Sequence, residues 1–97
     1  MYAIALDLDG ESLGSQANRA VSDPHHQIGE VLQKLGFHRR QGSVYFGGAT
    51  INAGTCVLAA FELARVPPWF SASVRDIRML RIEESNDLMP AVQQVMT

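Results

Sequence analysis

The chain has one cysteine, few aromatic residues and no long hydrophobic run, and each shortage excludes a class of protein. Cys56 is the single cysteine, which excludes an intrachain disulfide and a zinc site built from cysteines. No apolar stretch approaches the roughly 18 residues of a membrane-spanning helix. The N-terminus has no basic segment and reaches a carboxylate at Asp7, which is atypical of a signal peptide. We therefore expect a cytoplasmic protein without a membrane anchor.

Basic charge is scarce and comes almost entirely from arginine. Lys34 is the single lysine, and the formal net charge is −2 with a pI near 5.8. This balance excludes a uniformly basic surface for nucleic acid. Arg75, Arg78 and Arg81 nevertheless fall within a short stretch, so positive charge is concentrated locally.

Length and hydrophobic patterning predict one α+β domain over residues 1–97. Hydrophobic residues make up 46% of the 97 residues and charged residues 19%, which is typical of a globular chain. Alternation and helical periodicity give the order strand, helix, strand, strand, helix, strand. The expected strands are 2–8, 37–41, 43–46 and one within 74–84, and the expected helices are 24–35 and about 51–65. This is the ferredoxin-like split βαβ arrangement (βαββαβ), an antiparallel sheet with both helices on one face.

Local signals set the ends and faces of these elements. Asp23 and Pro24 suit a helix start, and Gly36 suits the left-handed residue after its end. Thr50 is the expected N-cap of the second helix, and a short helix is expected after Asn86. The expected buried stripe of the second helix is Val57, Leu58, Phe61 and Ala64. Residues 11–22 are expected to form a long connection.

Three stretches resemble the virulence-associated protein D (VapD) family. They are Met1–Asp9, Gln41–Phe46, and Trp69-Phe70 followed by Ser73–Glu84, in matching order and spacing over roughly residues 1 to 88. The family is similar in fold to small CRISPR-associated spacer-acquisition nucleases. The resemblance implies a homodimer with endoribonuclease activity, acting as the toxin of a toxin–antitoxin pair. Between 11 and 27 the chain departs from the family pattern, so the resemblance assigns these residues no role and identifies no antitoxin.

Carried over by position, the resemblance places the family's active-site residues on Asp7, Ser43 and Asp76. In a symmetric dimer, two copies of Asp7 can approach each other across the two-fold axis. Paired carboxylates can hold Mg²⁺ against phosphate oxygens, or a single carboxylate can act as general base on a ribose 2′-hydroxyl. Ser43 can position phosphate. The structural alternatives are a solvated turn for Asp7, a turn-capping hydroxyl for Ser43 and a local salt bridge for Asp76.

Arginines and one tyrosine are the candidate RNA contacts. In a regular strand Arg78 shares a face with Asp76, whereas Arg75 and Arg81 fall on the other face, so the three arginines cannot form one patch. We expect either Arg75 or Arg78 to bind phosphate. Arg39 can add to a phosphate-binding rim beside the Gln41-Gly42-Ser43 turn. Tyr45 is the favoured stacking residue for a base. The histidines, including the adjacent pair His25 and His26, are expected on the surface.

The sequence supports three functions. The first is an RNA-cleaving homodimer. The second is a non-enzymatic nucleic-acid-binding or assembly scaffold of the same fold. The third is a small regulatory domain that binds a metabolite on the open face of its sheet, which would require a pocket there.

Overall fold

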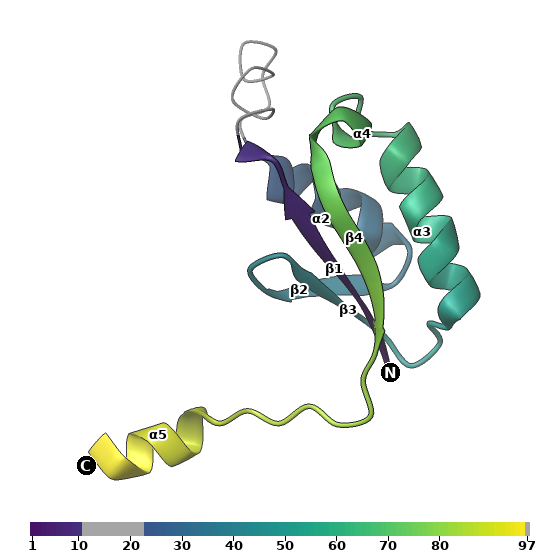
Figure 1. The fold of residues 1–97 in the computed structure, drawn as a ribbon. Coiled ribbons are helices and arrows are strands. Elements are labelled where there is room, and N and C mark those ends of the chain that lie inside the picture. Colours follow the sequence, from purple (N-terminus) through teal and green to yellow (C-terminus); the bar gives the residue numbers. More distant parts are fainter. Residues whose placement is uncertain (11–22, 97) are drawn as a thin grey trace.

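The computed structural model describes residues 1–10 and 23–96 and contains a four-stranded antiparallel sheet (Figure 1). The strands are β1 (Tyr2–Leu8), β2 (Phe37–Gln41), β3 (Val44–Gly47) and β4 (Val74–Arg81), in the order β2-β3-β1-β4. This order and the α+β composition confirm the ferredoxin-like prediction. The expected connection over residues 11–22 lies outside the described residues.

Two helices cover one face of the sheet. These are α2 (Pro24–Lys34) and α3 (Ala53–Arg65), while α4 (Phe70–Ser73) is a single turn before β4 (Figure 1). Alternation along β1 directs Ile4 and Leu6 toward these helices and Ala3, Ala5 and Asp7 toward the opposite, open face. The core between the sheet and the helices also contains Ile28, Leu32, Phe37, Tyr45, Cys56, Ala59, Leu63, Trp69 and Phe70.

The predicted start of α2 is confirmed and its end lies one residue earlier than predicted, at Lys34, whereas the start of α3 needs a correction. The Asp23 side chain accepts a hydrogen bond from the backbone N–H of His26, and Gly36 has φ of 98° after the helix end. Helix α3 begins at Ala53 with Asn52 as its N-cap, accepting from the N–H of Thr55. The prediction of Thr50 is wrong because Ala49 and Thr50 lie in a turn, which the N–H of Ile51 closes by donating to the Gly48 carbonyl oxygen at 3.1 Å, and the helix begins only after Ile51 has packed into the core.

The predicted buried face of α3 is also wrong. The buried residues are Cys56, Ala59 and Leu63, whereas Leu58 and Phe61 are 59% and 65% exposed. The sequence of α3 has two apolar faces, and helical periodicity cannot choose between them. The side that packs against the core carries two small residues, Cys56 and Ala59, together with Leu63. The bulkier residues are left as an exposed apolar surface, the α3 outer face, made of Val57, Leu58 and Phe61.

The chain after β4 leaves the body of the protein. Helix α5 (Met89–Met96) stands apart from the sheet at the end of an extended segment (Figure 1). Its apolar residues are exposed, among them Val92 and Val95, and so is Leu88 just before the helix. An isolated helix of two turns is marginal in water, so α5 needs a surface to pack against. Within the described parts of the chain, no helix has the length and hydropathy to cross a membrane.

The packing of Ile51 at the junction between β3 and α3 can be tested by a substitution at Gly47. A Cβ at Gly47 would lie 2.7 Å from Cγ2 and 2.8 Å from Cβ of Ile51, which is 8% exposed. We expect Gly47→Ala to lower the free energy of unfolding by about 1–3 kcal/mol because the core is overpacked. Urea denaturation measures this loss.

The matched control is the neighbouring substitution Gly48→Ala. A Cβ at Gly48 would meet only the carbonyl oxygen of Gly36, at 3.6 Å, which is ordinary contact. Its effect on stability should be small. Equal losses for the two variants would contradict the described packing of Ile51.

Candidate functional site

One end of the sheet gathers the acidic residues that the sequence singled out. Asp7 at the end of β1 lies directly opposite Asp76 near the start of β4 in the antiparallel register. Both side chains project from the open face, and they are 61% and 46% exposed. Opposed residues in such a ladder have Cα atoms about 4.5–5.5 Å apart, so the two carboxylates are neighbours. Like charges in this position repel, at a cost of a few tenths to about 1 kcal/mol.

Two arginines lie beside the acidic pair, Asp7 and Asp76. Arg78 Nε donates to both carboxylate oxygens of Asp76, at 3.2 and 3.0 Å. The guanidinium of Arg75 lies 3.9 Å from the Asp7 carboxylate and 4.0 Å from that of Asp9. Positive charge therefore partly offsets the repulsion between the two aspartates.

Arg75 reaches the acidic pair because β4 is irregular there. Asp7 pairs with Asp76 but Leu8 pairs with Val74, so Arg75 falls between paired residues. Such an inserted residue bends the strand and redirects its side chain. The expectation that Arg75 lies on the opposite face of β4 assumed a regular strand, and the proximity of Arg75 to Asp7 shows that it is wrong. Arg81 lies opposite Tyr2, at the far end of β4 from Asp76.

Ser43 lies at the same end of the sheet, one strand away from the acidic pair. The backbone N–H of Leu6 donates to the Ser43 carbonyl oxygen at 3.0 Å, which fixes Ser43 beside the last residues of β1. The chain turns just before it at Gly42, where φ is 53°. The Ser43 side chain is half-buried. The structure therefore brings Asp7, Asp76 and Ser43 to one end of the sheet, where alternation gives Ser43 the parity of Tyr45 and not that of the acidic pair.

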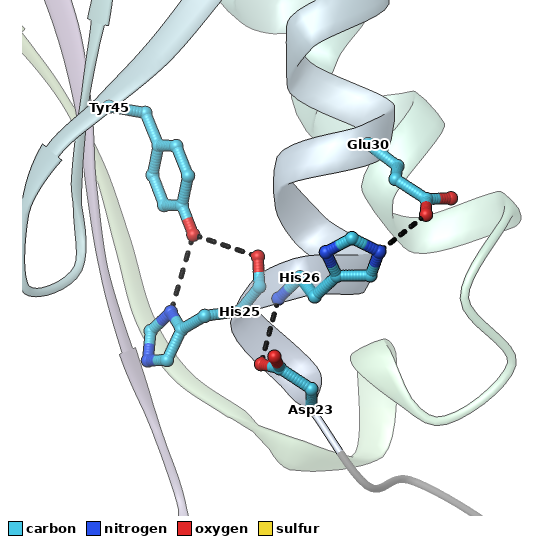
Figure 2. Close-up of polar contacts among 5 residues, drawn as sticks. All are labelled: Asp23, His25, His26, Glu30 and Tyr45. Carbon is cyan, nitrogen blue, oxygen red and sulfur yellow. Dashed lines mark hydrogen bonds and ion pairs between the residues drawn. The ribbon is translucent and has the colours of Figure 1, made fainter.

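Tyr45 lies on the other face of the sheet, and its predicted stacking role is wrong. Its side chain is 0% exposed in the core beneath α2. Its hydroxyl lies 3.2 Å from His25 Nδ1 and donates to the His25 carbonyl oxygen at 3.4 Å (Figure 2). Alternation along β3 points Tyr45 toward the helices, so its ring has no face free for a base. Burial raises the pKa of the Tyr45 hydroxyl.

Arg39 also lies away from the acidic pair. Its Nε donates to the Gly42 carbonyl oxygen at 2.7 Å, and its side chain lines a hollow between α2 and β2. We call this the α2–β2 hollow. Its volume is about 360 Å³, and its lining includes Asp23, His25, His26, Glu30, His38 and Arg39.

His25 is a polar residue of the α2–β2 hollow that sequence reasoning placed on the surface. It is half-buried at the first turn of α2. Burial lowers its pKa from the usual value of 6.5, the Arg39 charge lowers it further, and Asp23 opposes both. A signal was present in the sequence, because His25 precedes Ile28 and Leu32 by three and seven residues. That spacing puts it on the buried stripe of the helix. His26 points outward, 2.7 Å from Glu30 (Figure 2).

The acidic pair has the donor chemistry of a magnesium site. Carboxylate oxygens are hard ligands, and Mg²⁺ is commonly held by one or two carboxylates together with substrate phosphates and water. Among residues 1–10 and 23–96, no group of three or more histidine, cysteine or acidic side chains could hold a metal by itself. Two carboxylates leave further coordination positions that oxygen ligands from outside the protein can fill.

The chain is similar along its whole length to proteins named as endoribonucleases. It is 47% identical over 96 residues to an endoribonuclease VapD homolog of Helicobacter pylori, covering 99% of this chain and 100% of that protein. It is 46% identical over 93 residues to endoribonuclease VapD 2 of Riemerella anatipestifer, covering 95% of this chain and 99% of that protein.

A third relative is more distant but equally complete. It is an endoribonuclease VapD homolog of Neisseria gonorrhoeae, 37% identical over 93 residues, covering 96% of this chain and 99% of that protein. No family model matches the chain. The identity to these relatives is high and extends over nearly the entire length of each protein. The chain therefore belongs to the VapD family.

Proposed function

We propose that this protein is an endoribonuclease and that its active site is the sheet end carrying Asp7, Asp76 and Ser43. The observation that carries the proposal is the register that holds two solvent-exposed carboxylates opposite each other. Such a pair is costly for the fold, and a role in binding a cation or substrate accounts for its presence. The names of the relatives support RNA as the substrate.

Each residue at this end has a task that its geometry suits. Asp7 and Asp76 would hold Mg²⁺, which supplies a Lewis acid for phosphate oxygens. Arg78 holds the Asp76 carboxylate in place, and its guanidinium is 72% exposed and so can also meet a phosphate. Arg75 supplies a second positive charge beside Asp7. The Ser43 hydroxyl positions the phosphate chain at the edge of the sheet.

The proposed enzyme is a homodimer that packs through the open face of its sheet. The centre of this face is apolar, because Ala3 on β1 lies between its cross-strand partners, Phe46 on β3 and Leu80 on β4. Leu80 is 38% exposed, and the apolar residues of α5 are exposed as well. A two-fold contact between such faces would cover apolar area on both copies and bring their acidic pairs toward a shared groove.

The proposed physiological role is that of a toxin held in check by a small antitoxin protein in the cytoplasm, where its RNA substrates are. This role is supported by the family resemblance and by the α3 outer face, which offers exposed apolar side chains to a protein partner. The outer face of α3 and the open face of the sheet are different surfaces. An antitoxin and a second subunit can therefore bind together.

Removal of the Asp7 charge tests the active site. We expect Asp7→Asn to reduce RNA cleavage about 100-fold or more, because half of the cation site is lost. Its thermal midpoint should be equal to or above that of the wild type, because the repulsion with Asp76 is relieved. EDTA should stop wild-type cleavage and added Mg²⁺ restore it.

Glu84→Gln is the matched control, since it removes one exposed negative charge beyond the far end of β4. It should cleave RNA like the wild type. A scaffold of the same fold predicts a different outcome, in which RNA binding is unchanged in Asp7→Asn and no cleavage occurs in either protein. Wild-type rates in Asp7→Asn would place the active site elsewhere.

Sedimentation equilibrium tests the dimer. The wild type should sediment at twice the chain mass of 10.6 kDa. Leu80→Asp should be a monomer, because it places a charge in the proposed interface. Leu58→Asp, on the α3 outer face, should remain a dimer. A dimer that survives Leu80→Asp and is lost in Leu58→Asp would assign the interface to α3 instead.

Controlled expression in a bacterial host tests the toxin role. Induction of the wild type should slow growth and degrade cellular RNA, whereas Asp7→Asn at the same protein level should do neither. Growth arrest by the inactive variant would indicate that toxicity does not depend on RNA cleavage.

A further inference from the structure

Strand β4 is an outer strand of the sheet, and the helix layer stops short of it. Among residues 1–10 and 23–96, β1 is the one strand that pairs with β4, so the other edge of β4 has no neighbouring strand. Met79 lies opposite Ile4 in the register and therefore shares its face, the one that carries the helices. Ile4 is 2% exposed, whereas Met79 is 49% exposed. The underside of β4 is thus only partly covered.

A hollow lies between the underside of β4 and helix α3. We call it the β4 hollow. Its volume is about 190 Å³, its surface is almost entirely apolar, and its lining includes Val57, Ala60 and Phe61 of α3 with Ile77 and Met79 of β4. Figure 1 shows α3 along the β4 side of the sheet. Because Val57 and Phe61 also belong to the α3 outer face, the hollow continues the surface that is proposed above for an antitoxin.

We propose that the antitoxin binds by adding an extended, acidic segment to the free edge of β4, with one apolar side chain of that segment in the β4 hollow. This inference rests on the toxin role proposed above, and it identifies the docking surface and the chemistry of the partner.

The main chain of β4 and the position of the hollow both favour a strand as the occupant. In an antiparallel sheet, alternate residues of an outer strand turn their N–H and C=O groups away from the sheet, where an extended peptide can pair with them. A strand added there lies about 4.8 Å beyond β4 and directs every second side chain to the helix face. The β4 hollow opens on that face, because Val57, Phe61 and Met79 in its lining are all exposed. Main-chain pairing would give such a complex affinity, and the hollow would give it specificity.

The charge along β4 favours an acidic partner over a second copy of this chain. Strand β4 contains Arg75, Arg78 and Arg81 but one acidic residue, Asp76, so its net charge is +2. A second copy that paired through its own β4 would bring the same positive charge alongside. Acidic side chains instead form cross-strand pairs of opposite charge with these arginines. The proposed dimer uses the open face of the sheet, which leaves this edge accessible.

A segment bound at this edge would also close the proposed active site. Arg78 shares the open face with Asp76 and donates to its carboxylate. An acidic side chain on the open face of the added strand would be a cross-strand neighbour of Arg78 and would compete there with a phosphate of the RNA. The bound segment should therefore raise the KM for RNA and leave kcat unchanged.

The experiment uses a synthetic peptide of alternating glutamate and leucine, acetylated and as long as β4, with isotope-labelled full-length protein. NMR signals of β4 and of the α3 residues around the β4 hollow should shift and saturate as the peptide is added. Hydrogen exchange of the β4 amides that do not pair with β1 should slow about tenfold or more. In a cleavage assay, the same peptide should raise the KM for RNA.

Two control peptides separate main-chain pairing from charge. An N-methylated peptide of the same sequence lacks the backbone donors, and a peptide with lysine in place of glutamate keeps them but reverses the charge. Neither should slow exchange of the β4 amides. Equal binding of the N-methylated peptide, or signal shifts confined to the open face, would overturn the proposal.

A matched pair of variants tests the β4 hollow. Ala60→Trp fills it, so the affinity for the acidic peptide should fall about tenfold or more, because the burial of one leucine side chain is lost. Leu58→Trp places the same side chain on α3 outside the lining of the hollow and should bind the peptide like the wild type. Both variants should cleave RNA normally. If Ala60→Trp does not fold, the comparison of the three peptides still decides the question.

The outcomes separate this inference from the function on which it rests. If the wild type cleaves RNA and slows growth but the acidic peptide leaves β4 unchanged, the proposed function stands and this docking surface fails. If the outer amides of β4 exchange slowly before any peptide is added, a second copy already occupies the edge, for example through its acidic Glu83 and Glu84, and the inference is overturned. If the peptide binds at β4 and the protein cleaves no RNA, the docking surface stands and the enzyme proposal fails.

Discussion

Two carboxylates opposite each other in a sheet are the constraint around which this protein is organised. The register of β1 against β4 sets Asp7 beside Asp76, and Arg75 and Arg78 lie close enough to offset part of their repulsion. Strand β1 is also the central partner of β3, which brings Ser43 to the same edge. A one-residue slip of β1 would turn Asp7 into the core and Leu6 out to solvent. The hydrophobic core therefore fixes the site as firmly as it fixes the fold.

Much of this arrangement is predictable from sequence because local patterns determine it. Alternation along 2–8 separates Ile4 and Leu6 from Asp7, and Asp23, Pro24 and Gly36 mark the ends of α2. What sequence could not predict depends on long-range packing. The displaced position of Arg75 comes from an irregular pairing with β1, and the exposed face of α3 follows from which side of that helix packs against the core. Neither is encoded in nearby residues.

The two faces of the sheet have different chemistry at this edge. The open face carries exposed carboxylates and arginines suited to phosphate and a cation, whereas the helix face carries a half-buried histidine supported by a buried tyrosine. Tyr45 was expected to stack on a base, and its burial gives it a supporting position instead. Parity along β3 explains the burial of Tyr45, because its side chain points toward the helices and lies beneath α2.

The central claim is that RNA is cleaved at the sheet end carrying Asp7, Asp76 and Ser43. A crystal structure with an RNA that carries a 2′-O-methyl group at the cleavage position tests it most directly, since this RNA binds but cannot react through its 2′-oxygen. The account predicts that the phosphate at that position lies against the acidic pair and the Ser43 hydroxyl. RNA bound on another surface, with this edge empty, would contradict it.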